Sequence, residues 1–173
     1  MPAFFRRITG KAVRGCCSLI PALALLAGCQ SWHTSHGFTD AQIAALERVG
    51  FSRMADGGTM EFDATDRLLF ATGDATLGPE ATRALERIGH VLIAMHVEHI
   101  CVDGYTDAEG SVNYNQQLSM RRANAVAGVL VGIGIPPKDI QVHGYGKASP
   151  VADNDSRSGR TQNRRAAVVV SSE

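Results

Sequence analysis

Two long segments of the chain place apolar residues at helical spacing. The first is PEATRALERIGHVLIAMHV (79–97), whose opening Pro79 suits the first turn of a helix. The second begins at Ser111 and ends near Gly134, because two prolines soon follow. The apolar stripes are formed by Leu85, Ile88, Leu92 and Met95 in the first segment, and by Leu118, Ala125, Val126, Val129, Leu130 and Ile133 in the second. Two amphipathic helices are therefore expected.

Four short strand-like segments alternate with these helices or follow them. They are RLLFAT (67–72), HICVDGY (99–105), DIQVHGYG (139–146) and RRAAVVV (164–170). The polar stretch NDSRSGRTQN (154–163) is interpreted as a loop. Strands that alternate with helices predict an α/β (α+β) two-layer sandwich with a partly parallel sheet.

Smaller elements are predicted ahead of this domain. Residues 30–37 are polar and small, as in a tether. Thr39 and Gln42 fit a capping box, followed by a short helix that Gly50 ends. The segment FSRMADGGTMEF (51–62) alternates around an Asp-Gly turn signal and is interpreted as a possible hairpin. We therefore expect a tether over residues 29–63 and the main domain over residues 64–173.

Residues 1–28 have the features of a secretory signal. A basic start precedes the apolar run CCSLIPALALLAG (16–28), which is too short for a membrane-spanning helix and contains Pro21. The stretch Leu26-Ala27-Gly28-Cys29 resembles the bacterial lipobox; an ordinary signal peptide that happens to contain a cysteine is the alternative. The resemblance implies that Cys29 becomes the first residue and carries acyl chains such as palmitate, which would anchor the protein to a membrane. Gln30 in the next position favours the outer membrane, facing the periplasm.

Cleavage changes the charge and the cysteine count. The chain has 17 basic and 17 acidic residues, and the signal removes four basic ones, leaving 13 against 17 and a net charge of −4. A nucleic acid partner is not expected, because a polyanion would require a basic surplus. Cys16 and Cys17 leave with the signal and Cys29 is lipidated, so Cys101 remains alone and no internal disulfide is expected.

Arg122 occupies an unusual position in the second helical segment. It falls in the middle of the apolar stripe, where a guanidinium is costly unless an anion pairs with it. Asp107 directly follows a predicted strand, fifteen residues earlier, where α/β folds present ligand-binding groups. The pair could be an internal salt bridge. It could instead bind a ligand with adjacent ammonium and carboxylate groups, with Asn115 supplying further hydrogen bonds.

Three motifs then indicate a family. DGYTDAEG (103–110), YNQQLSMRRA (114–123) and GYGKASPVADND followed by GRTQNRR resemble the peptidoglycan-binding domain of OmpA C-termini and peptidoglycan-associated lipoproteins, over residues 64–171. The resemblance implies a βαβαββ order and a mixed parallel and antiparallel sheet. It also implies that Asp107 and Arg122 hold the free amino-acid end of diaminopimelate. Tyr105 stands where the family usually has His. Further implied contacts are Thr106, Asn115 and Arg164, with Gly73 and Asp74 in a loop that closes the pocket.

The front of the chain adds a second resemblance. LAGCQ and GFTDAQIAALERVGF (37–51) look like YfiB-type outer-membrane lipoproteins, which sequester a small periplasmic repressor of an inner-membrane diguanylate cyclase. This implies that Ile43, Leu46 and Phe51 belong to a partner-binding or switch segment. The alternative is that Ile43 and Leu46 only pack the short helix on its own domain.

Enzyme and metal chemistry are not expected. His90 and His96 lie about 240° apart around one helix and cannot jointly ligate a metal, and the chain has no nucleophile-elbow serine. We therefore expect a non-enzymatic binding module without cofactor or metal. A purely structural tether between outer membrane and cell wall is the main alternative, and a cell-wall hydrolase is a third.

Overall fold

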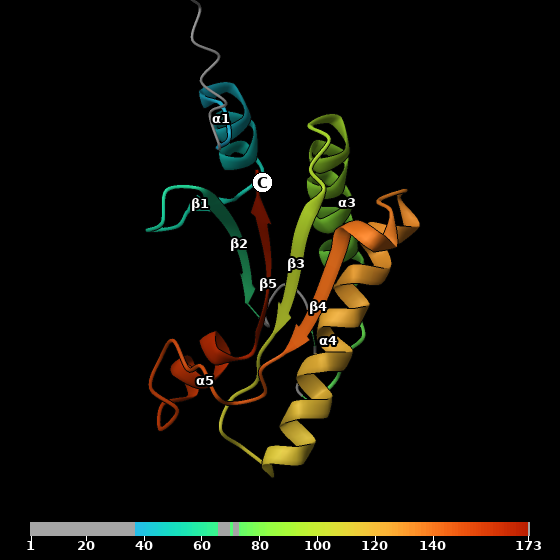
Figure 1. Ribbon diagram of the computed structural model, residues 1–173. Helices are drawn as coiled ribbons and strands as arrows, with labels where there is room; N and C mark the ends of the chain where they lie inside the picture. The colour runs from blue at the N-terminus through green and yellow to red at the C-terminus, as the bar shows by residue number, and fades with distance from the viewer. Residues whose placement is uncertain (1–36, 66–69, 71–72, 173) are drawn as a thin grey trace, which may run out of the picture. The chain divides into compact units, whose positions relative to one another are not determined.

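Five strands form one mixed sheet in the order β1-β2-β5-β3-β4 (Figure 1). The computed structural model describes residues 37–65, 70 and 73–172, all within the unit 34–173. The strands are β1 (Ser52–Arg53), β2 (Thr59–Thr65), β3 (His99–Gly104), β4 (Ile140–Gly144) and β5 (Arg165–Ser171). β3 and β4 are parallel, whereas β5 runs antiparallel to both β2 and β3. The predicted partly parallel α/β sandwich is therefore confirmed.

Two long helices lie against the same face of the sheet (Figure 1). α3 (Pro79–Ala94) and α4 (Val112–Gly132) correspond to the two amphipathic segments, and Pro79 is in the first turn as predicted. Their apolar stripes meet the inward-facing residues of β3 and β5. The core includes Leu85, Ile88, Leu92, Val126, Leu130, Ile100, Val102, Val168 and Val170. Within the part of the chain described, no helix is long and apolar enough to cross a membrane.

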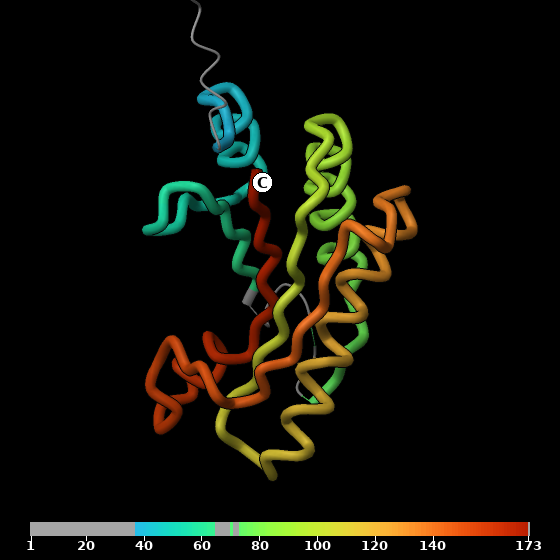
Figure 2. The backbone as a smooth tube through the Cα atoms, in the orientation of Figure 1, coloured from blue at the N-terminus to red at the C-terminus, as the bar shows by residue number. Residues whose placement is uncertain are grey.

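The alternation along β3 gives the sheet two different faces. Ile100 and Val102 are buried beneath the helices, while Cys101 and Asp103 are only partly buried on the opposite face. Successive side chains of a strand point to opposite faces, which accounts for this division. At the end of β3 the chain turns into the loop that carries Asp107, and the backbone trace follows this turn (Figure 2).

The short N-terminal elements form as predicted. α1 (Asp40–Arg48) begins at the N-cap Thr39, whose side chain and that of Gln42 make the full capping box. Gly50 ends the helix with a φ of +101°, a conformation that favours glycine. β1 pairs with β2 as the predicted hairpin.

The structure changes two details of the expected organisation, and a third lies mostly outside the described residues. The boundary at residues 63/64 falls inside β2, so the hairpin belongs to the same sheet as the main domain. Of the expected strand 67–72, only Phe70 is described, in an isolated bridge with Leu77. The expected loop at 154–163 is wrong in part, because Arg157–Asn163 form the helix α5. Ser156 caps this helix, with its hydroxyl accepting from the N–H of Gly159.

Candidate functional site

Asp107 lies just past the end of β3, in the loop that leads to α4. It is only 7% exposed. Its carboxylate accepts a hydrogen bond from the backbone N–H of Glu109 at 3.1 Å, and its other oxygen forms an ion pair of 3.0 Å with Nη1 of Arg164. The sequence predicted an anionic group at the end of this strand, and the structure places it there.

Arg122 is the largest fully buried side chain in the described part of the chain, with 0% exposure. Its Nε donates to the carbonyl of Asp74 at 3.0 Å and its Nη1 to the carbonyl of Tyr105 at 3.3 Å. The guanidinium carbon also lies 5.1 Å from the ring centre of Phe70. The prediction that Arg122 enters the core is confirmed. It joins the end of β3 to the loop before α3.

Two glycines bring α4 close enough to the sheet for this arrangement. A side chain at Gly104 would fall on the carbonyl of Ser119, and one at Gly144 would lie 2.7 Å from the backbone N of Met120. Ser119 is fully buried between these elements, and its hydroxyl accepts from the N–H of Gly146 at 2.9 Å. Close packing of helix on strand therefore sets the depth at which Arg122 lies.

Thr106 and Asn115 fix the loop on either side of Asp107. Thr106 donates its N–H to the carbonyl of Gly146 and its hydroxyl to the carbonyl of Asp107. The Nδ2 of Asn115, on the first turns of α4, donates to the carbonyl of Glu109 at 2.7 Å. Both side chains are buried. In this structure they hold the backbone of the loop.

The segment with Gly73 and Asp74 approaches the same edge. Gly73 has a φ of +73°, which favours glycine, and Asp74 contributes the carbonyl that Arg122 contacts. Hydrogen bonds from the hydroxyl of Thr76 and from the N–H groups of Ala75 and Thr76 lower the pKa of Asp74, and the positive charge of Arg122 acts in the same direction. The Asp74 side chain therefore remains an anion that orders its own turn.

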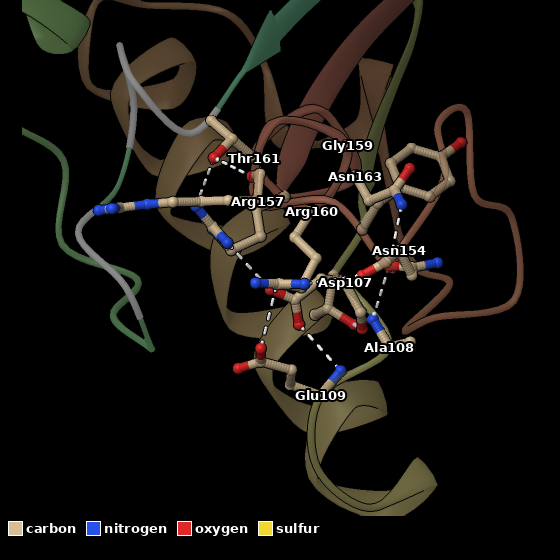
Figure 3. Close-up of polar contacts among 12 residues, drawn as sticks. Asp107, Ala108, Glu109, Asn154, Arg157, Gly159, Arg160, Thr161 and Asn163 are labelled. Atoms are coloured by element: carbon tan, nitrogen blue, oxygen red, sulfur yellow. Dashed lines mark hydrogen bonds and ion pairs between the residues drawn. The ribbon is translucent and has the colours of Figure 1, made fainter.

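The helix α5 supplies contacts that the sequence interpretation missed. Nε of Arg160 lies 3.1 Å from a carboxylate oxygen of Glu109 (Figure 3). Nη2 of Arg164 donates to the hydroxyl of Thr161. From the other side, Nζ of Lys147 donates to the carbonyl of Gly110 at 3.1 Å. Arg160 lies within α5, whereas Arg164 directly follows the helix as its C-cap.

The matches with known proteins extend beyond the site. A model of the OmpA family matches residues 69–164, more than half of the chain. The chain belongs to the OmpA family. It is 39% identical to the outer-membrane lipoprotein YfiB of Pseudomonas aeruginosa over 148 residues, which cover 86% of this chain and 87% of that protein. It is 37% identical to the lipoprotein YfiB of Escherichia coli, covering 84% of this chain and 89% of the relative.

A solved structure agrees in fold with this OmpA-family chain. The cell wall anchor of the T6SS from Pseudomonas aeruginosa superposes with a TM-score of 0.65 at 25% identity, covering 80% of this chain and 99% of that one. The likeness is one of overall fold. It places the present chain among known domains of this architecture.

The residues expected to form a switch in this OmpA-family chain are largely internal. Leu46 is 0% exposed and belongs to the core, and Phe51 is 3% exposed with its ring centre 5.8 Å from that of Phe62. Ile43 is partly buried against the same core. Their packing agrees with the alternative that α1 rests on its own domain. Cys29 lies outside the described residues.

Tyr105 forms part of an aromatic stack on the face of the sheet opposite α4. Its ring lies between the guanidinium of Arg165, 3.7 Å from the ring centre, and the ring of Tyr145, 5.3 Å away. Burial, with the negative charge of Asp103, raises the pKa of Tyr105 to about 12. The phenol is therefore neutral at physiological pH, beside the candidate site.

Two hollows elsewhere on the domain do not belong to this edge. One, of about 240 Å³, lies between the start of α1 and the turn before β3, around Phe38 and His96. The other, of about 490 Å³, lies over the starts of β3 and β4, around Cys101 and Gln141. Both lie toward the start of β3, whereas Asp107 follows the strand's end. The charged groups of the candidate site lie in the loop after β3, away from both hollows.

Proposed function

We propose that this chain is an outer-membrane lipoprotein whose OmpA domain binds peptidoglycan non-covalently, through the diaminopimelate of the stem peptide. The observation that carries the proposal is a pair of charged groups at one edge of the sheet. A carboxylate, on Asp107, is held just past β3. A buried guanidinium, on Arg122, is anchored to the carbonyl of Tyr105, two residues before that carboxylate.

Opposite charges at one edge suit a ligand that carries both signs. The free end of diaminopimelate has an ammonium and a carboxylate on one carbon. In the proposal the ammonium binds Asp107, and the carboxylate binds Arg122 through charge-assisted hydrogen bonds. Thr106 and Asn115 keep the loop in place, Arg164 supports Asp107, and the segment with Gly73 and Asp74 closes the pocket.

Binding without catalysis can be tested on purified cell-wall sacculi. The full chain in detergent should co-sediment with sacculi and leave their peptides intact. Release of soluble muropeptides would contradict the non-enzymatic function. Failure to co-sediment, with sacculi that a known wall-binding protein does bind, would contradict the proposed ligand.

The membrane anchor is proposed to be the acylated Cys29. Replacing the sulfur removes the site of diacylation, and anchoring depends on burying those acyl chains. Cys29→Ser should therefore move the protein from the membrane fraction to the soluble envelope fraction, whereas Cys101→Ser should not. Equal membrane retention of both variants would contradict lipidation at Cys29.

A signalling role is the finer part of the proposal. The chain would sequester a small periplasmic repressor of a diguanylate cyclase, with the segment of Ile43, Leu46 and Phe51 acting as the switch. Matches to two YfiB lipoproteins over more than four fifths of the chain support it. Because Leu46 is buried, α1 must leave the core before this side chain becomes available to a partner.

The alternative is a purely structural tether of the outer membrane to the cell wall. Pull-down of periplasmic proteins with the full chain separates the two. Capture of the repressor, increased by Leu46→Pro, would support the switch, because proline breaks the helix that packs on the core. If Leu46→Pro left both wall binding and repressor capture unchanged, the switch hypothesis would be wrong.

A further inference from the structure

Asn163, the last residue of α5, has a fully used side-chain amide. Its Oδ1 accepts from the N–H groups of Val151 and Ala152, at 2.8 and 3.0 Å. Its Nδ2 donates to the carbonyl of Ala152 and to Oδ1 of Asn154, at 2.8 and 2.9 Å. The side chain is 0% exposed. Only a primary amide offers two acceptor positions and two donors together, so Asn163 fixes the preceding loop at three residues.

Asn154 connects the side chain of Asn163 to the loop that carries Asp107. Its Oδ1 accepts both the Nδ2 of Asn163 and the backbone N–H of Ala108, the latter at 3.0 Å (Figure 3). Ala108 directly follows Asp107 and lies 46 residues from Asn154 in the chain. The Oδ1 of Asn154 is thus fixed by the buried side chain of Asn163, and it in turn fixes the peptide N–H that follows Asp107.

The helix α5 can deliver these contacts because it lies directly on the loop before it. A side chain at Gly159 would fall on the carbonyl of Asp153, so only glycine allows this approach. Nη1 of Arg160 donates to the carbonyls of Asn154 and Asp155, which fixes the backbone of Asn154 as well. The position of Asn154 is therefore determined from both its side chain and its backbone.

We propose that Asn154 is a positioning residue for ligand binding, which acts through the peptide N–H of Ala108 to hold the Asp107 carboxylate toward the ammonium of the ligand. The proposal rests on the proposed function, and it adds a residue outside the pair of charges. Asp107 is constrained through its own ion pair with Arg164, and the Asn154 contact restrains the backbone that carries it. Pre-ordering a binding group in this way strengthens binding by reducing the cost of ordering it later.

The test compares two ligands on the full chain in detergent. One is the tripeptide L-Ala-γ-D-Glu-meso-diaminopimelate, and the other is its 2-aminopimelate analogue, which keeps the distal carboxylate but lacks the distal amine. The variants are Asn154→Ala, which removes the acceptor, and Asn154→Asp, which keeps it. Asn124→Ala is the matched control, because its Nδ2 donates only to the carbonyl of Met120 on the exposed side of α4 among the contacts described.

The expected result is a loss that depends on the amine. Asn154→Ala should bind the diaminopimelate peptide roughly tenfold more weakly, and the analogue with less than about twofold change, in NMR titrations. Asn154→Asp should stay within about threefold of the wild type, and Asn124→Ala should match it. A merely structural role would weaken both ligands equally. Equal weakening of both ligands would overturn the proposal. So would an Asn154→Ala variant with unchanged affinity for the diaminopimelate peptide, or an Asn154→Asp variant that binds this peptide as weakly as Asn154→Ala.

Hydrogen exchange separates this proposal from the function on which it rests. The Ala108 amide should exchange faster in Asn154→Ala than in the wild type and Asn154→Asp, whether or not a ligand is present. If the wild type binds neither peptide, the proposed ligand is wrong. If it binds the diaminopimelate peptide but Ala108 exchange does not respond to Asn154→Ala, the positioning role is wrong. If Asn154→Ala does not fold, the Ala108 amide of Asn154→Asp still tests the positioning role. Faster exchange there than in the wild type would contradict it, because the acceptor is kept.

Discussion

Asp107 and Arg164, 57 residues apart in the chain, are joined by an ion pair of 3.0 Å. Asp107 lies in the loop after β3 and Arg164 lies between α5 and β5, so the pair connects that loop to the start of β5. Arg122 reaches the same end of β3 from α4, and its guanidinium donates hydrogen bonds to the carbonyls of Asp74 and Tyr105. The guanidinium groups of Arg164 and Arg122 and the carboxylate of Asp107 therefore lie at the same end of β3.

The close packing of α4 on β3 predicts contrasting effects of two glycine substitutions. Gly104→Ala should lower the free energy of unfolding by about 3 kcal/mol or more, because its methyl group would meet the backbone carbonyl of Ser119. Gly128→Ala, at an exposed position of α4 with open space around it, should raise it by up to about 1 kcal/mol. Urea unfolding measures both. Equal effects would contradict the described contact between helix and strand.

The burial of Leu46 predicts that α1 contributes to the stability of the domain. Leu46→Ala should lower the free energy of unfolding by about 2–5 kcal/mol, since it removes a fully buried side chain. Glu47→Ala, at the exposed neighbouring position, is the control and should change it little. Chemical denaturation measures the difference. A Leu46→Ala variant as stable as the control would show that α1 does not pack on the core in solution.

Glu61 predicts a pH-dependent effect on stability. Burial, with the nearby charge of Asp63, raises its pKa above the ordinary value of 4.5. The folded state then disfavours the carboxylate, so the stability linked to this group is present below pH 4.5 and is lost as the pH rises through the folded-state pKa. Glu61→Gln should therefore melt at a higher temperature than the wild type at pH 7.

The same comparison at low pH provides the control for Glu61. At about pH 3 the side chain is neutral whether the protein is folded or not, so the two melting temperatures should agree. Glu47→Gln should show no comparable difference at either pH. A Glu61→Gln variant that melts at a lower temperature than the wild type at pH 7 would contradict the burial of this carboxylate.

Much of this architecture follows from local patterns in the sequence. Helical spacing predicted α3 and α4, and the one charge on an apolar stripe correctly identified Arg122 as buried. The capping pair Thr39 and Gln42 predicted α1. In each case the residues that form the pattern lie within a few positions of one another or on one face of a single element.

The features that the sequence did not reveal depend on distant contacts. The helix α5 has no apolar stripe, and its order comes from the cap at Ser156, the close approach at Gly159 and the amide of Asn163. Its polar composition is typical of a loop. The pairing of Asp107 with Arg164 depends on that helix and could not be predicted while the segment was assigned as a loop.

The most direct test of the proposed binding site is calorimetric titration of the diaminopimelate tripeptide into the full chain. Asp107→Ala and Arg122→Ala should each weaken binding by about 3–5 kcal/mol, which is two orders of magnitude or more. The first leaves the ammonium of the ligand without its carboxylate partner, and the second leaves the carboxylate of the ligand without its guanidinium partner. Arg121→Ala, at the exposed neighbouring position of α4, should bind like the wild type. Retained affinity in both Asp107→Ala and Arg122→Ala, with the variants folded, would contradict the assignment of this edge as the peptidoglycan site.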